Sequence, residues 1–401
     1  MPFTSNRGSN ITASPIRSLV PFARKAEKDG KKVFYLNIGQ PDIPTPTTAL
    51  NAMKKESNSI IKYGPSEGFY SLREKVAIYY NRFNGRLIAD DVIVTTGASE
   101  AILFVLLACC DINDEIIIPE PFYANYIGFA HTSNVKIVSA STTLEDKFKL
   151  PDPSVFEKLI TENTKAIFLC NPGNPTGQLY TQEQLQKLIS LAIDRNIFLI
   201  VDEVYKEFCY DQEFTSVLSF PEADEHVIVI DSISKVFSSC GARIGYLITK
   251  NKEFRDTAIK FAQMRLCPPH FGQVLAEACY DDAINYINEA KAEYKKRREV
   301  LHKGLLKIEG LKTYKPDAAF YNIIELPIPD VTDFCKWMLA EFSYENKTVM
   351  LAPADGFYQN SSLGKNQARI AYVLNCKDLE EALTCLNHAL ITYKANVLNL
   401  V

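Results

Sequence analysis

Lys235 and Arg243 are eight residues apart, and together with Ser232 they follow one apolar run of the chain. A lysine amine can form a Schiff base with an aldehyde, and an arginine can hold a phosphate through two parallel hydrogen bonds. Asp202 and Tyr205 follow a second apolar run and offer a carboxylate and a phenol. Such a set could bind an anionic aldehyde and use the lysine as a nucleophile.

Further positions that follow apolar runs carry groups of related chemistry. Ala98 and Ser99 open a predicted helix, whose free N–H groups and positive dipole end could bind a phosphate. Tyr123 could stack on a flat ring, and Asn174 lies in an unusual loop with two Asn-Pro pairs, residues 171–177. Each feature alone is also typical of a turn, a helix cap, a packing residue or a surface lysine. The prediction therefore depends on their joint arrangement.

Together these groups match the chemistry of pyridoxal phosphate. Lys235 would form a Schiff base with its aldehyde, and Asp202 would pair with the protonated pyridine nitrogen and keep the ring an electron sink. Asn174 and Tyr205 would hydrogen-bond the phenolic oxygen and so hold down the pKa of the imine. The phosphate would lie against the N-terminus of the predicted helix.

The middle of the chain alternates short apolar runs with helical patterns. Seven runs rich in Ile and Val are predicted to be strands buried on both faces: 92–96, 115–118, 135–139, 166–170, 197–201, 227–231 and 244–249. Helical patterns lie between many of them, at 99–110, 153–161 and 181–196, and Thr181 with Gln184 fits a capping box. This alternation predicts an α/β fold with a mostly parallel, seven-stranded sheet covered by helices on both faces. Ligands of such sheets bind outside the carboxyl ends of the strands, where the residues above fall.

From about residue 281 the pattern changes to a long charged helix and a few short strands. The helix covers 284–307, the strands 319–326, 349–352 and 368–373, and a last helix lies near 379–394. This part is predicted to be a second, smaller α+β domain. We interpret the basic run Lys295-Lys296-Arg297-Arg298 as a solvated helix face.

Composition excludes several classes of protein. The chain has 401 residues, 44 Lys and Arg, 48 Asp and Glu and a net charge of −4, so it lacks the basic character of nucleic-acid and anionic-membrane binders. Its longest apolar run, 101–110, is too short to span a bilayer, and its start lacks the apolar core of a secretory signal. Ten cysteines without a C-x-x-C spacing predict free thiols in a reducing compartment, the cytoplasm. Five scattered histidines predict no metal site.

Short motifs run in a fixed order from about residue 14 to residue 369. They are Gly39-x-Pro41-Asp42, Tyr63-x-Pro65-x-x-Gly68, Asn171-Pro172-x-Asn174-Pro175-Thr176-Gly177, Asp202-x-x-Tyr205, Ser232-x-Ser234-Lys235, Gly241-x-Arg243-Ile244-Gly245-Tyr246 and Ala368-Arg369. In these motifs the chain resembles the class I aminotransferases among the fold-type I pyridoxal phosphate enzymes. The resemblance covers nearly the whole chain.

The resemblance implies further roles. Arg369 would bind the α-carboxylate of the substrate, with Asn174 and the backbone of Gly39 beside it. Ser234 would belong to the cofactor site. Tyr63 would reach the phosphate in the neighbouring subunit, which implies a homodimer with shared active sites. Residues 1–44 would join 286–401 as the small domain, and 45–285 would form the large, cofactor-binding domain.

The chain also departs from parts of the family. Ser99 stands where one branch has a lysine that helps grip a distal carboxylate. The start, Ser14-Pro15-Ile16-Arg17-x-Leu19, resembles another branch, whose amino donors vary. By its position Arg265 would lie near the partner's site, where it could bind an acidic side chain or form a structural salt bridge. The amino donor therefore stays open among aspartate, alanine and aromatic types.

These features predict transamination between an L-amino acid and a 2-oxo acid, with 2-oxoglutarate as the expected acceptor. Lys235 would act as general base and acid, moving a proton from the substrate α-carbon to the cofactor. One alternative is a β- or γ-lyase on the same fold, because the same carbanion serves both reactions. A second is a cofactor-binding regulator. A nicotinamide dehydrogenase is disfavoured because no G-x-G-x-x-G follows a predicted strand.

Overall fold

A computed structural model describes residues 2–5, 8–9, 11 and 15–397 of the chain. Its largest sheet has seven strands in the order β2-β8-β7-β6-β5-β3-β4. The strands are β2 (Val92–Thr95), β3 (Glu115–Glu120), β4 (Lys136–Ser141), β5 (Thr164–Cys170), β6 (Phe198–Asp202), β7 (Val227–Ser232) and β8 (Gly245–Ile248). Only β8 runs antiparallel to its neighbours in this sheet. The seven predicted strands and the mostly parallel sheet are confirmed.

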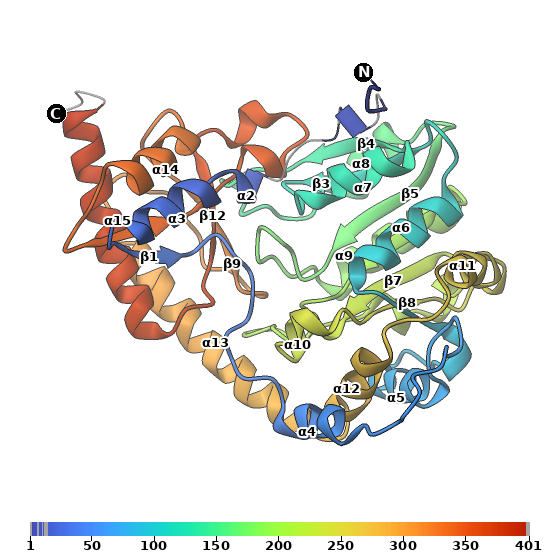
Figure 1. Ribbon diagram of the computed structural model, residues 1–401. Coiled ribbons are helices and arrows are strands. Elements are labelled where there is room, and N and C mark those ends of the chain that lie inside the picture. The colour runs from blue at the N-terminus through green and yellow to red at the C-terminus, as the bar shows by residue number, and fades with distance from the viewer. Residues whose placement is uncertain (1, 6–7, 10, 12–14, 398–401) are drawn as a thin grey trace.

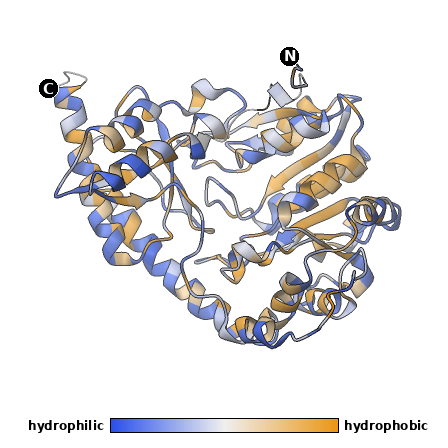
Figure 2. Cartoon of the chain, viewed as in Figure 1, coloured by the Kyte–Doolittle hydropathy of each residue, from blue (hydrophilic) through white to orange (hydrophobic). Residues whose placement is uncertain are grey.

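The strands of this sheet are apolar because helices cover both of its faces, as Figures 1 and 2 show. The helices of this part are α4 (Thr47–Lys55), α5 (Tyr70–Asn81), α6 (Ala98–Cys109), α7 (Asn125–Ser133), α8 (Pro153–Leu159), α9 (Gln182–Asp194), α10 (Ile233–Val236), α11 (Lys252–Arg265) and α12 (His270–Cys279). The capping box predicted for α9 is present, with Thr181 Oγ1 accepting from the Gln184 backbone.

Two smaller sheets form the other part of the molecule. In one, β1 (Lys32–Tyr35) pairs in parallel with β10 (Lys347–Met350); the other has the antiparallel order β11-β12-β9, from Ala352–Pro353, Gln367–Ala371 and Tyr321–Glu325. Around them lie α2 (Pro15–Ser18), α3 (Val20–Lys28), α13 (Ala283–Leu305), α14 (Val331–Ala340) and α15 (Cys376–Asn396). N-terminal β1 thus joins a sheet built from the C-terminal third of the chain. The domain boundaries at 44/45 and 285/286 stay a prediction.

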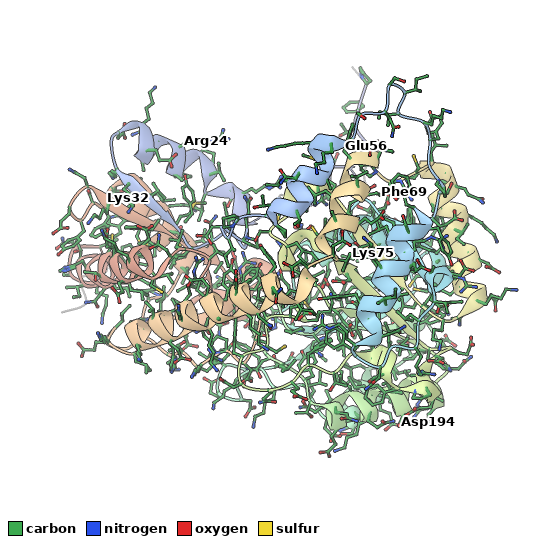
Figure 3. All side chains as sticks on the ribbon, turned by 90° about the horizontal axis from the view of Figure 1, so that it is seen from below. Arg24, Lys32, Glu56, Phe69, Lys75 and Asp194 are labelled. Atoms are coloured by element: carbon green, nitrogen blue, oxygen red, sulfur yellow. The ribbon has the colours of Figure 1, made fainter. Side chains whose placement is uncertain are left out.

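Helix α13 runs along the molecule from one part to the other, as the view from below shows, with Lys75 of α5 and Lys32 of β1 toward opposite ends (Figure 3). Its basic run is not wholly a solvated face, so that interpretation was wrong for two of the four residues. Arg297 and Arg298 are 5% and 0% exposed. Arg297 continues the buried stripe of Ala290 and Tyr294 because successive turns of a helix present every third or fourth residue to the core.

Both buried arginines are paired, as buried charges must be. Arg297 donates to Asp42 at 2.6 Å and to Glu293 at 2.9 Å. Arg298 donates to Asp211 at 2.7 Å and also reaches Glu299 at 2.9 Å. The Arg297–Asp42 pair joins the N-terminal segment to α13, a tertiary contact that the charge run did not reveal.

Two further sequence predictions can be compared with this fold. All ten cysteines are free, as expected. Within residues 15–397 and the short described stretches before them, no helix is both long and apolar enough to cross a membrane. The motif that begins at Ser14 lies partly outside the described residues.

Candidate active site

A cavity of about 960 Å³ opens at the carboxyl ends of β5, β6 and β7, where the large sheet faces the β9–β12 sheet. It collects almost every residue that the sequence predicted for the site. The predicted residues in its wall are Gly39, Ala98, Ser99, Tyr123, Asn174, Asp202, Tyr205, Ser232, Ser234, Lys235, Arg243 and Arg369. The fold thus brings together groups that lie up to 330 positions apart in the chain.

One end of the cavity is suited to an anion. Gly97, the residue before α6, has φ +73°, and a Cβ there would lie 2.3 Å from the Arg243 guanidinium. A Cβ at Gly245 would lie 2.5 Å from the Ala98 nitrogen. These two glycines let β8 and Arg243 approach the N-terminus of α6, whose first N–H groups have no partner within the helix. Arg243 itself donates to Cys240 O at 3.0 Å.

Ser232 ends β7 and caps the short helix α10, because its hydroxyl accepts from the Ser234 backbone at 2.9 Å. Lys235 lies one turn later, and its Nζ donates to the carbonyl oxygen of Gly39 at 2.8 Å. The Cys240 thiol is 3.9 Å from the same amine. The surrounding protein atoms keep water from this amine and thereby lower its pKa. A lysine with a lowered pKa has a larger fraction of neutral amine at neutral pH, and the neutral amine is the form that acts as a nucleophile or base.

Asp202 is the last residue of β6 and is 5% exposed. Its Oδ2 accepts from the Tyr126 hydroxyl at 2.8 Å, and its Oδ1 accepts from the Val204 backbone at 3.3 Å. Burial raises its pKa to about 6, although both hydrogen bonds act in the opposite direction. Among the described residues Asp202 forms no ion pair. The next residues form a turn and not the helix that Asp202 could have capped.

Arg369 lies on β12, opposite the large sheet, and is 2% exposed, which excludes a surface role. It donates to Asn174 Oδ1 at 3.0 Å and to the Asn37 carbonyl at 2.5 Å. The rings of Tyr321 and Phe357 lie 4.6 and 5.0 Å from its guanidinium. Its Nε has no protein partner. The group is held in place yet keeps donor capacity for a ligand.

Tyrosine side chains complete the wall. Tyr205 Oη accepts a hydrogen bond from Asn174 Nδ2 at 3.4 Å and lies 3.0 Å from Tyr321 Oη. Tyr123 packs edge-on against Tyr126, and burial raises the pKa of its phenol. At neutral pH these phenols are therefore hydrogen-bond donors.

Two predicted residues lie elsewhere. Tyr63 is 81% exposed and does not line this cavity. Arg265 donates to Glu100 at 2.9 Å and to the Ser66 and Val94 carbonyls. Of the two roles expected for it, these contacts match the structural salt bridge.

A sequence model for the family described as aminotransferase class I and II matches residues 31–385. The chain belongs to this family. It is 31% identical over 388 residues to a probable aspartate aminotransferase of Methanocaldococcus jannaschii, over 94% of this chain and 97% of the relative. Two solved structures, an aspartate aminotransferase from Thermotoga maritima and an alanine aminotransferase from Pyrococcus furiosus, each align with a TM-score of 0.88 over 97% of this chain and all of theirs, at 30% and 32% identity. Aminotransferases of this class use pyridoxal phosphate.

In this aminotransferase, the site residues that sequence reasoning missed include three that bind predicted side chains. Tyr126 binds Asp202 from α7, Tyr321 binds Tyr205 from β9, and Asn37 binds Arg369 from the segment after β1. Tyr126 follows Tyr123 by three positions, a helical spacing that could have suggested a shared environment. Tyr321 lies within an apolar strand and Asn37 outside any motif, so no local signal marks either residue.

Proposed function

We propose that the chain transfers an amino group between an L-amino acid and a 2-oxo acid with pyridoxal 5′-phosphate bound in this cavity. One observation carries the proposal: Lys235, Asp202 and Arg369 line the same cavity, from three different elements. The amine of Lys235 suits the aldehyde of the cofactor, and the carboxylate of Asp202 suits a protonated ring nitrogen. The buried guanidinium of Arg369 suits the carboxylate of a substrate. The named relatives and the family support the same reaction, and nothing favours a lyase or a regulator.

The residues present fit the cofactor. The phosphate would lie at the N-terminus of α6, with Ser99, Ser232, Ser234 and Arg243 around it. The glycine at 97 supports this placement, because a side chain there would fill the space beside the Arg243 guanidinium. Any anion at this end of the cavity would meet a helix dipole and an arginine.

The ring would lie over the end of β6. Asp202, whose pKa is raised to about 6 in the absence of a cationic partner, would gain one in a protonated pyridine nitrogen. Asn174 and Tyr205 would donate to the phenolic oxygen, and Tyr123 would cover the face of the ring. When bound, pyridoxal phosphate supplies an electron sink for negative charge at the substrate α-carbon.

The chain's own side chains perform the binding and proton-transfer steps. Arg369 binds the α-carboxylate, and its contacts to Asn174 and Asn37 fix its orientation. Lys235 would remove the proton from the substrate α-carbon as a base and then, as an acid, deliver it to the cofactor; its lowered pKa keeps a fraction of the amine neutral for the first step. The carbonyl of Gly39 holds the amine at the edge of the cavity between these steps.

The amino acceptor is 2-oxoglutarate, and the donor is of the aspartate, alanine or aromatic type. These classes follow the printed names of the relatives, which include aspartate, alanine and aromatic-amino-acid aminotransferases. A panel of amino acids with 2-oxoglutarate as acceptor identifies the donor.

A single-turnover experiment tests the reaction. The cofactor-loaded protein is mixed with an amino acid and no 2-oxo acid. A transaminase forms the corresponding 2-oxo acid in an amount equal to the bound cofactor, releases no ammonia and then stops. Continuous turnover with ammonia release would show a lyase, and the absence of any product from a broad panel would contradict the proposal.

We also propose a homodimer in which Tyr63 serves the partner's phosphate site. The exposed apolar side chains of Ile60, Met264 and Leu266, with exposures of 69%, 80% and 48%, support an interface near Tyr63. Mixed dimers of Lys235→Ala and Tyr63→Ala chains test it. A shared site restores one intact site per mixed dimer, up to roughly a quarter of wild-type activity after random pairing. Mixed dimers with no activity above the parents would contradict it.

A further inference from the structure

Tyr321 contacts three predicted parts of the active site at once. Its hydroxyl lies 3.0 Å from the Tyr205 hydroxyl, and its ring lies 4.6 Å from the Arg369 guanidinium. The same hydroxyl fills the space next to Gly39, where a Cβ would lie only 1.7 Å from it. Gly39 in turn accepts from the Lys235 amine. A single buried side chain, 2% exposed, therefore touches or adjoins the residues proposed for the cofactor, the substrate and the proton transfer.

Arg369, Asn174, Tyr205 and Tyr321 form a closed ring of contacts, here called the circuit. Arg369 donates to Asn174 Oδ1, Asn174 Nδ2 points to Tyr205 Oη, and Tyr205 Oη meets Tyr321 Oη. The Tyr321 ring then returns to Arg369. The four residues come from separate segments: Tyr321 lies on β9, Arg369 on β12, and Asn174 and Tyr205 in the turns after β5 and β6, so the circuit spans both walls of the cavity. Linked hydrogen bonds of this kind polarise one another in a water-poor interior.

Strand register explains why the ring meets the guanidinium. In the antiparallel pair β9–β12, Tyr321 lies opposite Ala371, and Arg369 is two residues before Ala371. Residues two apart on a strand point to the same face, so Tyr321 and Arg369 are diagonal neighbours on the face toward the cavity. Such neighbours lie within reach of aromatic and long side chains.

The direction of the hydrogen bond between the two phenols decides what Tyr321 can do. Burial raises the pKa of Tyr321 to about 12, and burial also raises that of Tyr205, so both carry their protons at neutral pH. If Tyr321 donates to the Tyr205 oxygen, the Tyr205 proton is free to point into the cavity. Only then can Tyr205 donate to the phenolic oxygen of a bound ring.

We propose that Tyr321 is a positioning residue of this enzyme, whose hydroxyl orients the Tyr205 proton toward the cofactor and whose ring supports Arg369 against the substrate. The inference rests on the proposed function. Its two parts make separable predictions, because the hydroxyl acts on the cofactor and the ring acts on the substrate clamp.

Tyr321→Phe removes the hydroxyl and keeps the ring. A weaker hydrogen bond from Tyr205 to the phenolic oxygen raises the pH midpoint of the absorbance change of the bound cofactor, by up to about one pH unit. The KM for the amino acid should change less than about threefold, since the ring still packs under Arg369. An absorbance titration of the substrate-free, cofactor-loaded protein measures the midpoint.

Tyr321→Leu removes the ring as well. The KM for every amino acid should then rise by about 3- to 30-fold, the loss expected for a cation–π contact. The matched control is Tyr372→Phe, which deletes a buried hydroxyl that donates to Ala319 O at 3.0 Å in the same part of the molecule. It should leave both the midpoint and the KM unchanged.

A double-mutant cycle shows whether Tyr321 acts through Tyr205. In a Tyr205→Phe background, Tyr321→Phe should add no further shift of the midpoint; two full, additive shifts would overturn the proposal. No shift in Tyr321→Phe, while Tyr205→Phe does shift the midpoint, would also overturn it and leave the proposed function standing. A wild-type protein that binds no pyridoxal phosphate would instead contradict the proposed function itself.

Discussion

The two walls of the cavity are built in different ways. The wall on the large sheet takes its side chains from the ends of neighbouring parallel strands, with Asp202 after β6 and Lys235 after β7. The opposite wall combines distant segments, because Gly39 follows β1, Tyr321 lies on β9 and Arg369 on β12. The first wall is fixed by a sheet that is buried on both faces, whereas the second depends on how separate parts of the chain pack.

This difference indicates that one wall binds mainly the cofactor and the other mainly the substrate. The wall on the large sheet carries the N-terminus of α6, the lysine and the buried carboxylate, which together suit the cofactor. The opposite wall carries a guanidinium held between two rings, which suits the substrate carboxylate. Variants in the first wall should change cofactor binding, and variants in the second should change substrate binding, apart from the Tyr321 hydroxyl, which acts on the cofactor through Tyr205.

Among the variants that compare the two walls, the largest effect is expected at Arg369. Arg369→Ala should lower kcat/KM for every amino acid by about 100-fold, since truncating a buried charged partner costs about 2–5 kcal/mol. Cofactor affinity should stay within about threefold, because Arg369 belongs to the substrate wall. Arg195→Ala, which removes a surface pair with Glu157, is the matched control. A loss confined to one amino acid, or a large loss of cofactor affinity, would break the division between the walls.

The pH dependence of protein stability tests the role of Asp202 in the wall on the large sheet. Its pKa is about 3.8 when unfolded and about 6 in the cofactor-free fold, so the folded protein keeps this proton longer as pH rises. Stability of the cofactor-free protein should therefore fall between about pH 4 and 6, and the cost is fully present above pH 6. Asp202→Asn removes this cost and should stabilise the cofactor-free protein at pH 8 by about 2–3 kcal/mol.

Denaturant unfolding at pH 4.5 and pH 8 measures the free energy of unfolding of Asp202→Asn against wild type. The control is Asp256→Asn, a substitution at an exposed residue. The gain should be much smaller at pH 4.5. The same variant should bind pyridoxal phosphate more weakly, because an amide cannot pair with a protonated ring nitrogen. A variant that is less stable than wild type at pH 8 would show that Asp202 is not held at an energetic cost.

The smallest of these effects is expected at Arg243. Arg243→Ala should weaken binding of pyridoxal phosphate by about 10- to 100-fold, the value of a charge-assisted hydrogen bond. The cofactor affinity of Arg243→Lys should lie between those of the wild type and Arg243→Ala, since a lysine keeps the charge but not the paired hydrogen-bond geometry. At saturating cofactor the KM for the amino acid should be near that of wild type. Unchanged affinity in a cofactor titration would remove Arg243 from the phosphate site.

The same contrast explains what the sequence could predict. The strands of the large sheet are continuous apolar runs, and the residues at their ends form short motifs, so the wall of Asp202 and Lys235 could be predicted. Arg369 was found through a motif, but its partners Asn37 and Tyr321 were not, because only tertiary packing brings them to it. The burial of Arg298 was missed for the same reason: its partner Asp211 lies far away in sequence.

Chemical labelling of Lys235 tests the central claim most directly. The protein is loaded with pyridoxal phosphate, reduced with borohydride, digested and mapped by mass spectrometry. We predict one labelled peptide, modified at Lys235, and no label in Lys235→Ala, which should still bind the cofactor noncovalently but lose turnover by about 10³-fold or more. Lys206 is a buried lysine next to Tyr205; it pairs with Asp231 and should remain unmodified. A label on Lys206, or on any lysine other than Lys235, would contradict the account.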